Sequence, residues 1–168
     1  PTSDPRMIEL AVTGIDVEVS VDGSSVVQVT RVDLPAGSHA GLFARLAGAC
    51  ALAGLTILDA RITTTRDGLA IDALHVADRG QAGPLSSVKA SRLITSMRDV
   101  LSGQVIVPDR LDAAPQRAHI EAFDLAPQVR ISNQLADHAS VIEVSGLDRP
   151  GLLYALLRAL FDINLSVS

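Results

Sequence analysis

The chain has 168 residues, of which 48% are apolar and 20% charged, and its formal net charge is −5. This composition excludes a disordered tail, and the negative charge argues against nucleic-acid or anionic-membrane partners, which need a basic surface. One cysteine excludes a disulfide framework, and no apolar run reaches the roughly 18 residues of a membrane span, so we expect a cytoplasmic protein.

The first elements in chain order are a hairpin and a helix. Residues 17–21 and 27–30 alternate between apolar and polar side chains, and Asp22-Gly23 between them is a strong signal for a tight turn. Residues 41–53 then carry apolar side chains at helical spacing, and Gly54 follows as a stop signal. The spacing predicts a helix over 41–53.

A second hairpin and a second helix follow. The runs 55–65 and 69–77 are rich in Ile, Thr and Val and meet at Asp67-Gly68. Residues 86–102 have one apolar face, with Ser86 or Ser87 placed to cap the helix start and Gly103 to end it. Val105-Ile106-Val107 is predicted to form a short closing strand, stopped by Pro108.

This order predicts an α+β fold with antiparallel sheets and helices on one face, the ferredoxin-like βαββαβ arrangement. We assign residues 1–107 to a first domain, which includes an additional hairpin strand at its start. Residues 108–127 contain three prolines and no periodicity, and are predicted to be a linker.

The pattern then restarts, which indicates an internal repeat. Residues 129–132 and 141–144 alternate like the first pair of strands, and Gly151-Leu152-Leu153 matches Gly41-Leu42-Phe43 at an offset of 110. Residues 128–168 are therefore predicted to begin a second domain that is incomplete, its remaining elements being either missing or supplied by another chain.

The most informative segment is the turn that precedes the helix of this second unit. Asp148 is placed to cap the helix, Pro150 fits its first turn, and Gly151 permits close backbone approach. Free amides at a helix start favour a carboxylate. The alternative is that this segment is a well-capped helix start and nothing more.

These residues resemble the ACT domain, a small ferredoxin-like module that binds amino acids. The tandem more narrowly resembles the C-terminal pair of ACT domains in the bifunctional uridylyltransferase/uridylyl-removing enzyme family. The segments that carry this resemblance are residues 41–48, 57–62 and 64–68, Asp72 and the block 141–154.

The resemblance implies a regulatory glutamine sensor that acts allosterically in nitrogen signalling and contains no catalytic residue or cofactor. Catalysis, with Mg²⁺ and UTP, would belong to upstream domains that modify the PII protein, and ACT modules would pair within or between chains. The implied ligand-binding residues come from both units: Asp148, Arg149, Pro150, Gly151, Leu152 and Asn164 in the second, and Asp33, Gly41, Leu42, Thr56 and Asp59 in the first.

The first unit departs from the family pattern, because its turn from Asp33 to Gly41 is five residues longer than the turn of the second unit. We therefore favour the second unit as the ligand-binding turn. An alternative function is a stand-alone ACT-repeat subunit that binds another amino acid and acts through oligomerisation.

The remaining candidates are isolated residues. Cys50 lies among alanines on the first predicted helix and is expected to be a small buried residue rather than a nucleophile. Asp137-His138 lies in a predicted hairpin turn without the additional ligands that a metal site requires.

Overall fold

The computed structural model describes residues 7–12, 15–21, 26–29, 41–64, 70–79, 83–109, 111 and 126–165. The chain divides into two compact units: Pro1–Leu111 with Pro150–Ser168, and Asp112–Arg149. The segment after Pro150 thus groups with the first half of the chain, although the sequence assigned it to a second domain. The predicted boundaries at residues 107 and 128 stay a prediction.

The first unit contains a five-stranded sheet with the order β1-β2-β3-β5-β4, in which all neighbours are antiparallel. Its strands are β1 (Met7–Val12), β2 (Ile15–Val21), β3 (Val26–Val29), β4 (Leu55–Thr64) and β5 (Ala70–Asp78). Both predicted hairpin pairings, β2 with β3 and β4 with β5, are confirmed, while their turn residues lie outside the described residues. Strand β1 was not anticipated.

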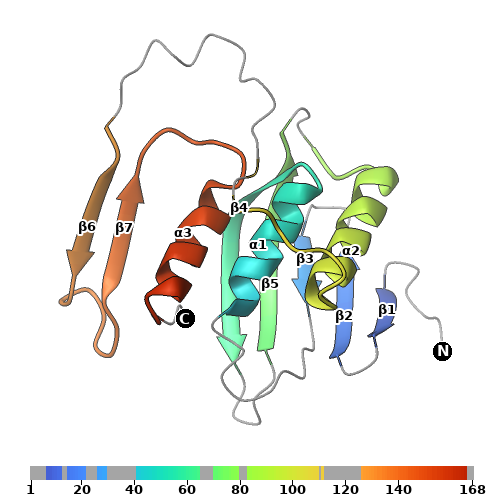
Figure 1. Ribbon diagram of the computed structural model, residues 1–168, viewed down its shortest axis with the longest axis horizontal. Coiled ribbons are helices and arrows are strands. Elements are labelled where there is room, and N and C mark those ends of the chain that lie inside the picture. The colour runs from blue at the N-terminus through green and yellow to red at the C-terminus, as the bar shows by residue number, and fades with distance from the viewer. Residues whose placement is uncertain are drawn as a thin grey trace. The chain divides into compact units, whose positions relative to one another are not determined.

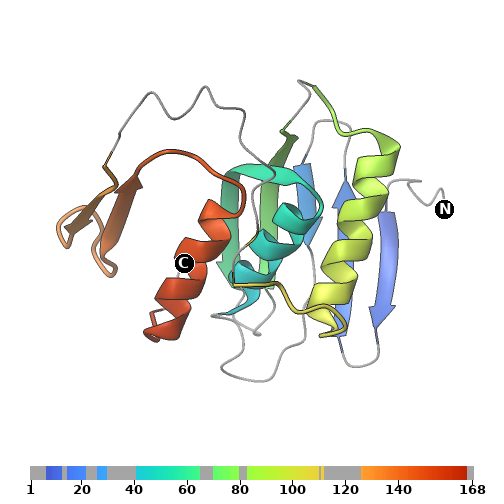
Figure 2. The same cartoon turned by 45° about the horizontal axis from the view of Figure 1, so that its top comes forward.

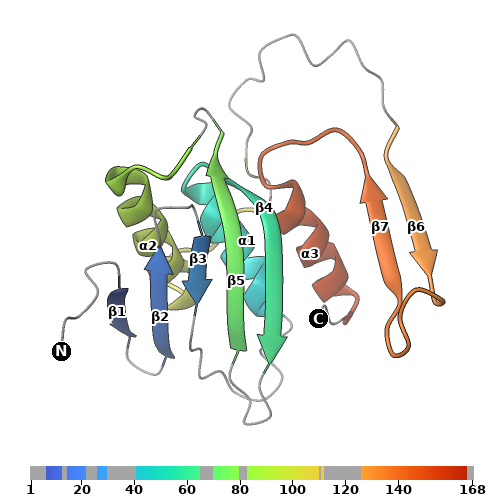
Figure 3. The ribbon, with the colours of Figure 1, turned by 180° about the vertical axis from the view of Figure 1, so that it is seen from behind.

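Helices α1 (Leu42–Leu52) and α2 (Ser87–Leu101) cover one face of this sheet (Figure 1). The predicted caps of both helices are confirmed: the Ser86 side chain accepts a hydrogen bond from the Lys89 amide at the start of α2, and Gly54 and Gly103 adopt positive φ after the two helix ends. From behind, the strands lie in front of the helices (Figure 3).

The core lies between the two helices and the central strands. Leu46 of α1, Leu93 and Met97 of α2, and Leu74 and Val76 of β5 are all fully buried. The Ser96 hydroxyl of α2 donates a hydrogen bond of 2.9 Å to the Ala49 carbonyl of α1. The apolar stripes read from the sequence therefore face each other and the sheet.

The prediction of a closing strand at Val105–Val107 is wrong. Strand β2 already pairs with β3 at the edge where the last strand of a ferredoxin-like sheet would lie. Residues 105–107 instead run beside α1, where the Val107 side chain is buried. The elements β3-α1-β4-β5-α2 are compatible with a ferredoxin-like unit whose last strand is replaced by β2.

The described part of the second unit contains a two-stranded antiparallel sheet of β6 (Gln128–Ser132) and β7 (Val141–Ser145), as predicted. Val129 pairs with Val144 and Ile131 with Ile142, whereas Arg130 pairs with Glu143. Because side chains alternate across a strand, the first two pairs share one apolar face. Valine and isoleucine on this face are exposed.

Among the described residues, no helix is both long enough and apolar enough to cross a membrane.

Candidate ligand-binding site

Helix α3 (Leu152–Asp162) is the counterpart of α1 in the repeat. Adding 110 to the bounds of α1, 42 and 52, gives the bounds of α3, 152 and 162. Each helix follows a glycine N-cap, Gly41 or Gly151, that provides no side-chain cap. The repeat in the sequence is thus matched by two helices of equal length, although their N-cap glycines differ in conformation: φ is −89° at Gly41 and 69° at Gly151.

Helix α3 lies beside α1, on the side away from α2 (Figure 2). A Cβ placed on Gly41 would lie 3.4 Å from the Phe161 ring, and one on Gly48 would lie 3.2 Å from the Tyr154 ring. The start of α1 is therefore near the end of α3, so the two helices are antiparallel. Their two N-terminal turns lie at opposite ends of the pair.

Gly48 is what lets the backbone of α1 come close to residues 105–107. A Cβ at this position would lie 2.8 and 2.9 Å from the two Val107 methyl carbons, distances that real Cβ atoms do not adopt. Glycine inside a helix costs about 0.5–1 kcal/mol relative to alanine, and here close packing requires it.

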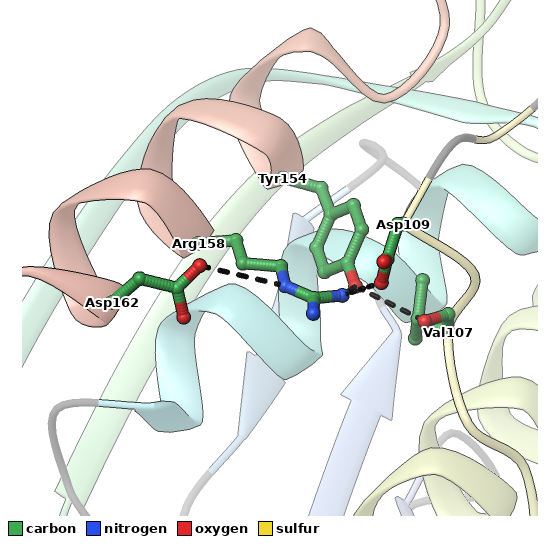
Figure 4. Close-up of polar contacts among 5 residues, drawn as sticks. All are labelled: Val107, Asp109, Tyr154, Arg158 and Asp162. Atoms are coloured by element: carbon green, nitrogen blue, oxygen red, sulfur yellow. Dashed lines mark hydrogen bonds and ion pairs between the residues drawn. The ribbon is translucent and has the colours of Figure 1, made fainter.

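A polar network joins α3 to the segment after α2 (Figure 4). The Tyr154 hydroxyl donates to the Val107 carbonyl at 3.1 Å, and the Arg158 Nη1 donates to the Tyr154 oxygen at 3.3 Å. Arg158 also pairs with Asp109, and its Nε lies 3.9 Å from the Asp162 carboxylate. The Tyr154 hydroxyl, followed by the Asp109 carboxylate, raises the pKa of Arg158, so the guanidinium stays charged.

Next to this network is a cleft of about 500 Å³, formed by α1, α3 and the segment after α2. Its polar lining comes from Arg45 of α1 and from Tyr154, Arg158 and Asp162 of α3. The rest of its lining is glycine or apolar: Gly41, Ala44, Val100, Gly103, Val105, Ile106, Val107 and Phe161. Of the site residues expected from the sequence, Gly41 lies in this cleft.

The turn that the sequence favoured as the ligand site differs from prediction at two residues. Gly151, with φ of 69°, is the N-cap residue of α3, so Asp148 is not the cap and Pro150 precedes the helix rather than entering its first turn. The expected close approach at Gly151 is confirmed, since a Cβ there would lie 2.7 Å from Leu111 Cδ1. Asp148 and Arg149 are exposed, and Leu152 is half-buried.

The sequence also predicted ligand-binding residues in the first unit. Asp33 lies outside the described residues, and the structure shows the surroundings of the others. Leu42 is buried in the core, which leaves only its backbone for a ligand. The Thr56 hydroxyl accepts a hydrogen bond from Arg79 Nε at 2.9 Å, and Asp59 is exposed on β4 opposite His75.

Asn164 has a structural role at the end of α3. It adopts φ of 59°, a left-handed conformation that asparagine tolerates better than most residues. Its amide donates to the Phe161 carbonyl and the Leu165 amide to the Leu160 carbonyl, both at 2.9 Å, which is the hydrogen-bond pattern of a Schellman motif. Gly54 holds the corresponding place after α1. The role of Asn164 in ligand binding stays a prediction.

Two isolated candidates have environments that the structure describes. Cys50 is buried, as expected, and burial raises the pKa of its thiol to about 12, so it is a poor nucleophile. Asp137 and His138 are exposed between β6 and β7, and no group of three or more metal-ligating side chains is found among the described residues.

The sequence interpretation missed Arg45, Tyr154 and Arg158. A signal for all three was present in the repeat at the offset of 110. Tyr154 and Arg158 take the places of Ala44 and Gly48, and Arg45 stands where the second unit has Ala155. Such replacements indicate positions at which the two helices differ in their surroundings.

Comparison with known proteins identifies relatives of the chain. The bifunctional uridylyltransferase/uridylyl-removing enzyme of Bradyrhizobium diazoefficiens is 37% identical over 155 residues, that of Azospirillum brasilense 43% over 143 residues, and that of Rhodospirillum rubrum 38% over 157 residues. The chain is homologous to one segment of these enzymes. The resemblance to this enzyme family is thereby confirmed, while the assignment to ACT domains stays a prediction.

The similarity covers most of the chain but little of its relatives. The three alignments span 92%, 83% and 92% of this chain and 17%, 15% and 17% of the respective enzymes. No family profile matches the chain, and no solved structure matches it.

Proposed function

We propose that the chain is an amino-acid-sensing regulatory segment of a bifunctional uridylyltransferase/uridylyl-removing enzyme, with glutamine as its effector. The observation that carries the proposal is the similarity to these enzymes over 92% of the chain. In this proposal the uridylyl-transferring and uridylyl-removing chemistry, with Mg²⁺ and UTP, takes place in other domains of the same cytoplasmic protein, and the PII protein is their substrate.

The fold supports a tandem of ACT modules. The elements β3-α1-β4-β5-α2 supply most of a ferredoxin-like unit, and the helix α3 repeats α1 in length and in its glycine N-cap. Strand β7, the turn and α3 then correspond in order to β3, the longer turn and α1. On this view residues 128–168 are the beginning of the second module.

The regulatory mechanism is a population shift. An effector moves the balance between two arrangements of modules and catalytic domains only if it binds one arrangement more tightly than the other. Coupling free energies of about 1–3 kcal/mol change an affinity about 5- to 150-fold, which is enough for a metabolic switch. Glutamine binding at the Asp148–Leu152 turn would provide this difference.

Calorimetric titration of the chain with glutamine tests the proposal, and saturable binding is expected. Gly151→Asp is a poor variant, because φ of 69° and the Leu111 side chain strain any larger residue. Arg149 is exposed, so Arg149→Gln leaves the fold intact and is expected to weaken binding about tenfold by removing a charged hydrogen-bond donor.

Arg130→Gln, on the exposed β6, is the matched control and should bind like the wild type. A flat titration of the wild-type chain contradicts glutamine sensing by this segment. Equal binding by Arg149→Gln and the wild type would remove the Arg149 side chain from the site.

A further inference from the structure

We propose that the cleft between α1, α3 and residues 103–107 binds a small organic carboxylate with an apolar body, and that Arg45 holds the carboxylate group. This site is separate from the Asp148–Leu152 turn and goes beyond glutamine sensing. The argument rests on the charges, the apolar walls and the size of the cleft.

Arg45 is the cation available to a ligand. It is exposed, and it forms no hydrogen bond or ion pair with the residues that the structure describes. Arg158, the other arginine of the cleft, is already engaged by Asp109, Tyr154 and Asp162. A guanidinium presents paired donors that match the two oxygens of a carboxylate.

The apolar part of the cleft is unusually open to solvent. Val105, Ile106 and Phe161 are 39%, 87% and 44% exposed, and all three line the same cleft. Covering such side chains with an apolar ligand body is favourable by about 25 cal/mol for each Å² removed from water. The exposed apolar walls therefore favour a ligand with a hydrocarbon or aromatic portion.

The volume of the cleft and the negative charge of Asp162 restrict the class of ligand further. A volume of about 500 Å³ lies within the range of small-molecule sites, roughly 300–1,000 Å³. The Asp162 carboxylate also lines the cleft, and it would repel a dianion such as phosphate more strongly than a monoanion. A singly charged carboxylate suits one free guanidinium beside one carboxylate.

The test is a nuclear magnetic resonance titration of the ¹⁵N-labelled chain with phenylacetate and with its neutral counterpart phenylacetamide. Phenylacetate should cause saturable shifts at the backbone amides of Arg45, Ile106 and Phe161, and phenylacetamide should bind about tenfold more weakly because it lacks the charge. Inorganic phosphate should bind more weakly than phenylacetate.

Two variants separate the role of Arg45 from a general loss of positive charge. Arg45→Gln should weaken phenylacetate binding about tenfold while leaving phenylacetamide binding unchanged. Arg92→Gln, which removes an exposed arginine from α2 outside this cleft, should leave both affinities unchanged. Circular dichroism spectra of both variants should match that of the wild type.

Three results would overturn the proposal: no saturable shift at the cleft, equal affinity for the acid and the amide, or unchanged phenylacetate affinity in Arg45→Gln. A glutamine titration of Arg45→Gln keeps the two proposals apart, because glutamine binding at the Asp148–Leu152 turn should not depend on Arg45. If the wild-type chain does not bind glutamine, phenylacetate should still bind at the cleft.

Discussion

Helices α1 and α3 have equal lengths and each begins after a glycine, yet they are buried to different extents. Eight residues of α1 are buried, whereas only Tyr154 and Leu157 of α3 are. Helix α1 packs against α2, α3 and the sheet, while the contacts of α3 with other described elements are chiefly with α1. A repeated sequence pattern thus determines where a helix starts and stops, but the neighbours of the helix determine how much it contributes to stability.

The largest expected difference comes from truncating the same leucine in both helices. Leu46 is fully buried and its counterpart Leu156 is half-buried. We expect Leu46→Ala to lower the free energy of unfolding by about 2–5 kcal/mol and Leu156→Ala by less than half as much, because the cost grows with the cavity left behind. Urea denaturation of both variants measures the difference, and equal losses would show that α3 is as well packed as α1.

The close contact between α1 and residues 105–107 depends on Gly48. Gly48→Ala places a Cβ within 2.9 Å of both Val107 methyl carbons and should cost about 1–3 kcal/mol through overpacking, despite the better helix propensity of alanine. Gly146→Ala is the control, since its Cβ would meet Pro127 at an ordinary 3.7 Å. A neutral or stabilising Gly48→Ala in thermal unfolding would contradict the packing described for α1 and residues 105–107.

A smaller effect is expected from the polar contact of α3. Tyr154→Phe removes the hydroxyl that donates to the buried Val107 carbonyl, and a lost hydrogen bond of this kind costs about 0.5–1.5 kcal/mol. Hydrogen exchange at the α3 amides should accelerate more than exchange at the α1 amides. Uniform acceleration in both helices would show that the contact stabilises the whole unit rather than the attachment of α3.

The smallest expected effect is on the pH dependence of stability, and it comes from Cys50 in α1. Burial raises the pKa of its thiol from 9.0 to about 12 in the folded state, so the folded protein binds this proton more tightly than the unfolded chain does. The resulting stability is complete below pH 9 and is lost as pH rises from 9 towards 12. The difference in unfolding free energy between wild type and Cys50→Ala should be constant between pH 8 and 9 and change only above pH 9.

Local patterns predicted most of the regular structure. The alternation of residues 17–30 and 55–77 corresponds to strands that pair as expected, and the apolar stripes of 41–53 and 86–102 correspond to buried helix faces. These predictions succeed because apolar periodicity and turn chemistry act between residues close together in the chain. Strand β1 lies at a sheet edge, and no comparable alternation led us to expect it.

The site was predicted less well than the fold. Gly41 lies in the cleft and Gly151 makes the expected close contact, but Asp148 is not the cap of α3 and Leu42 is turned into the core. Gly151 was predictable because its positive φ of 69° favours glycine, so the residue type itself indicates the backbone conformation. A side chain such as that of Arg45 gains its meaning only from what surrounds it.

Residue order and spacing alone predicted the helices, the two hairpins of the first half, the internal repeat and the resemblance to uridylyltransferase/uridylyl-removing enzymes. Three features became visible only in the folded chain: β2 takes the sheet edge expected for Val105–Val107, α3 packs against α1, and an open cleft with Arg45 lies beside these helices. These outcomes depend on competition between distant segments for the same edge or face, and that competition leaves no local signal in the chain.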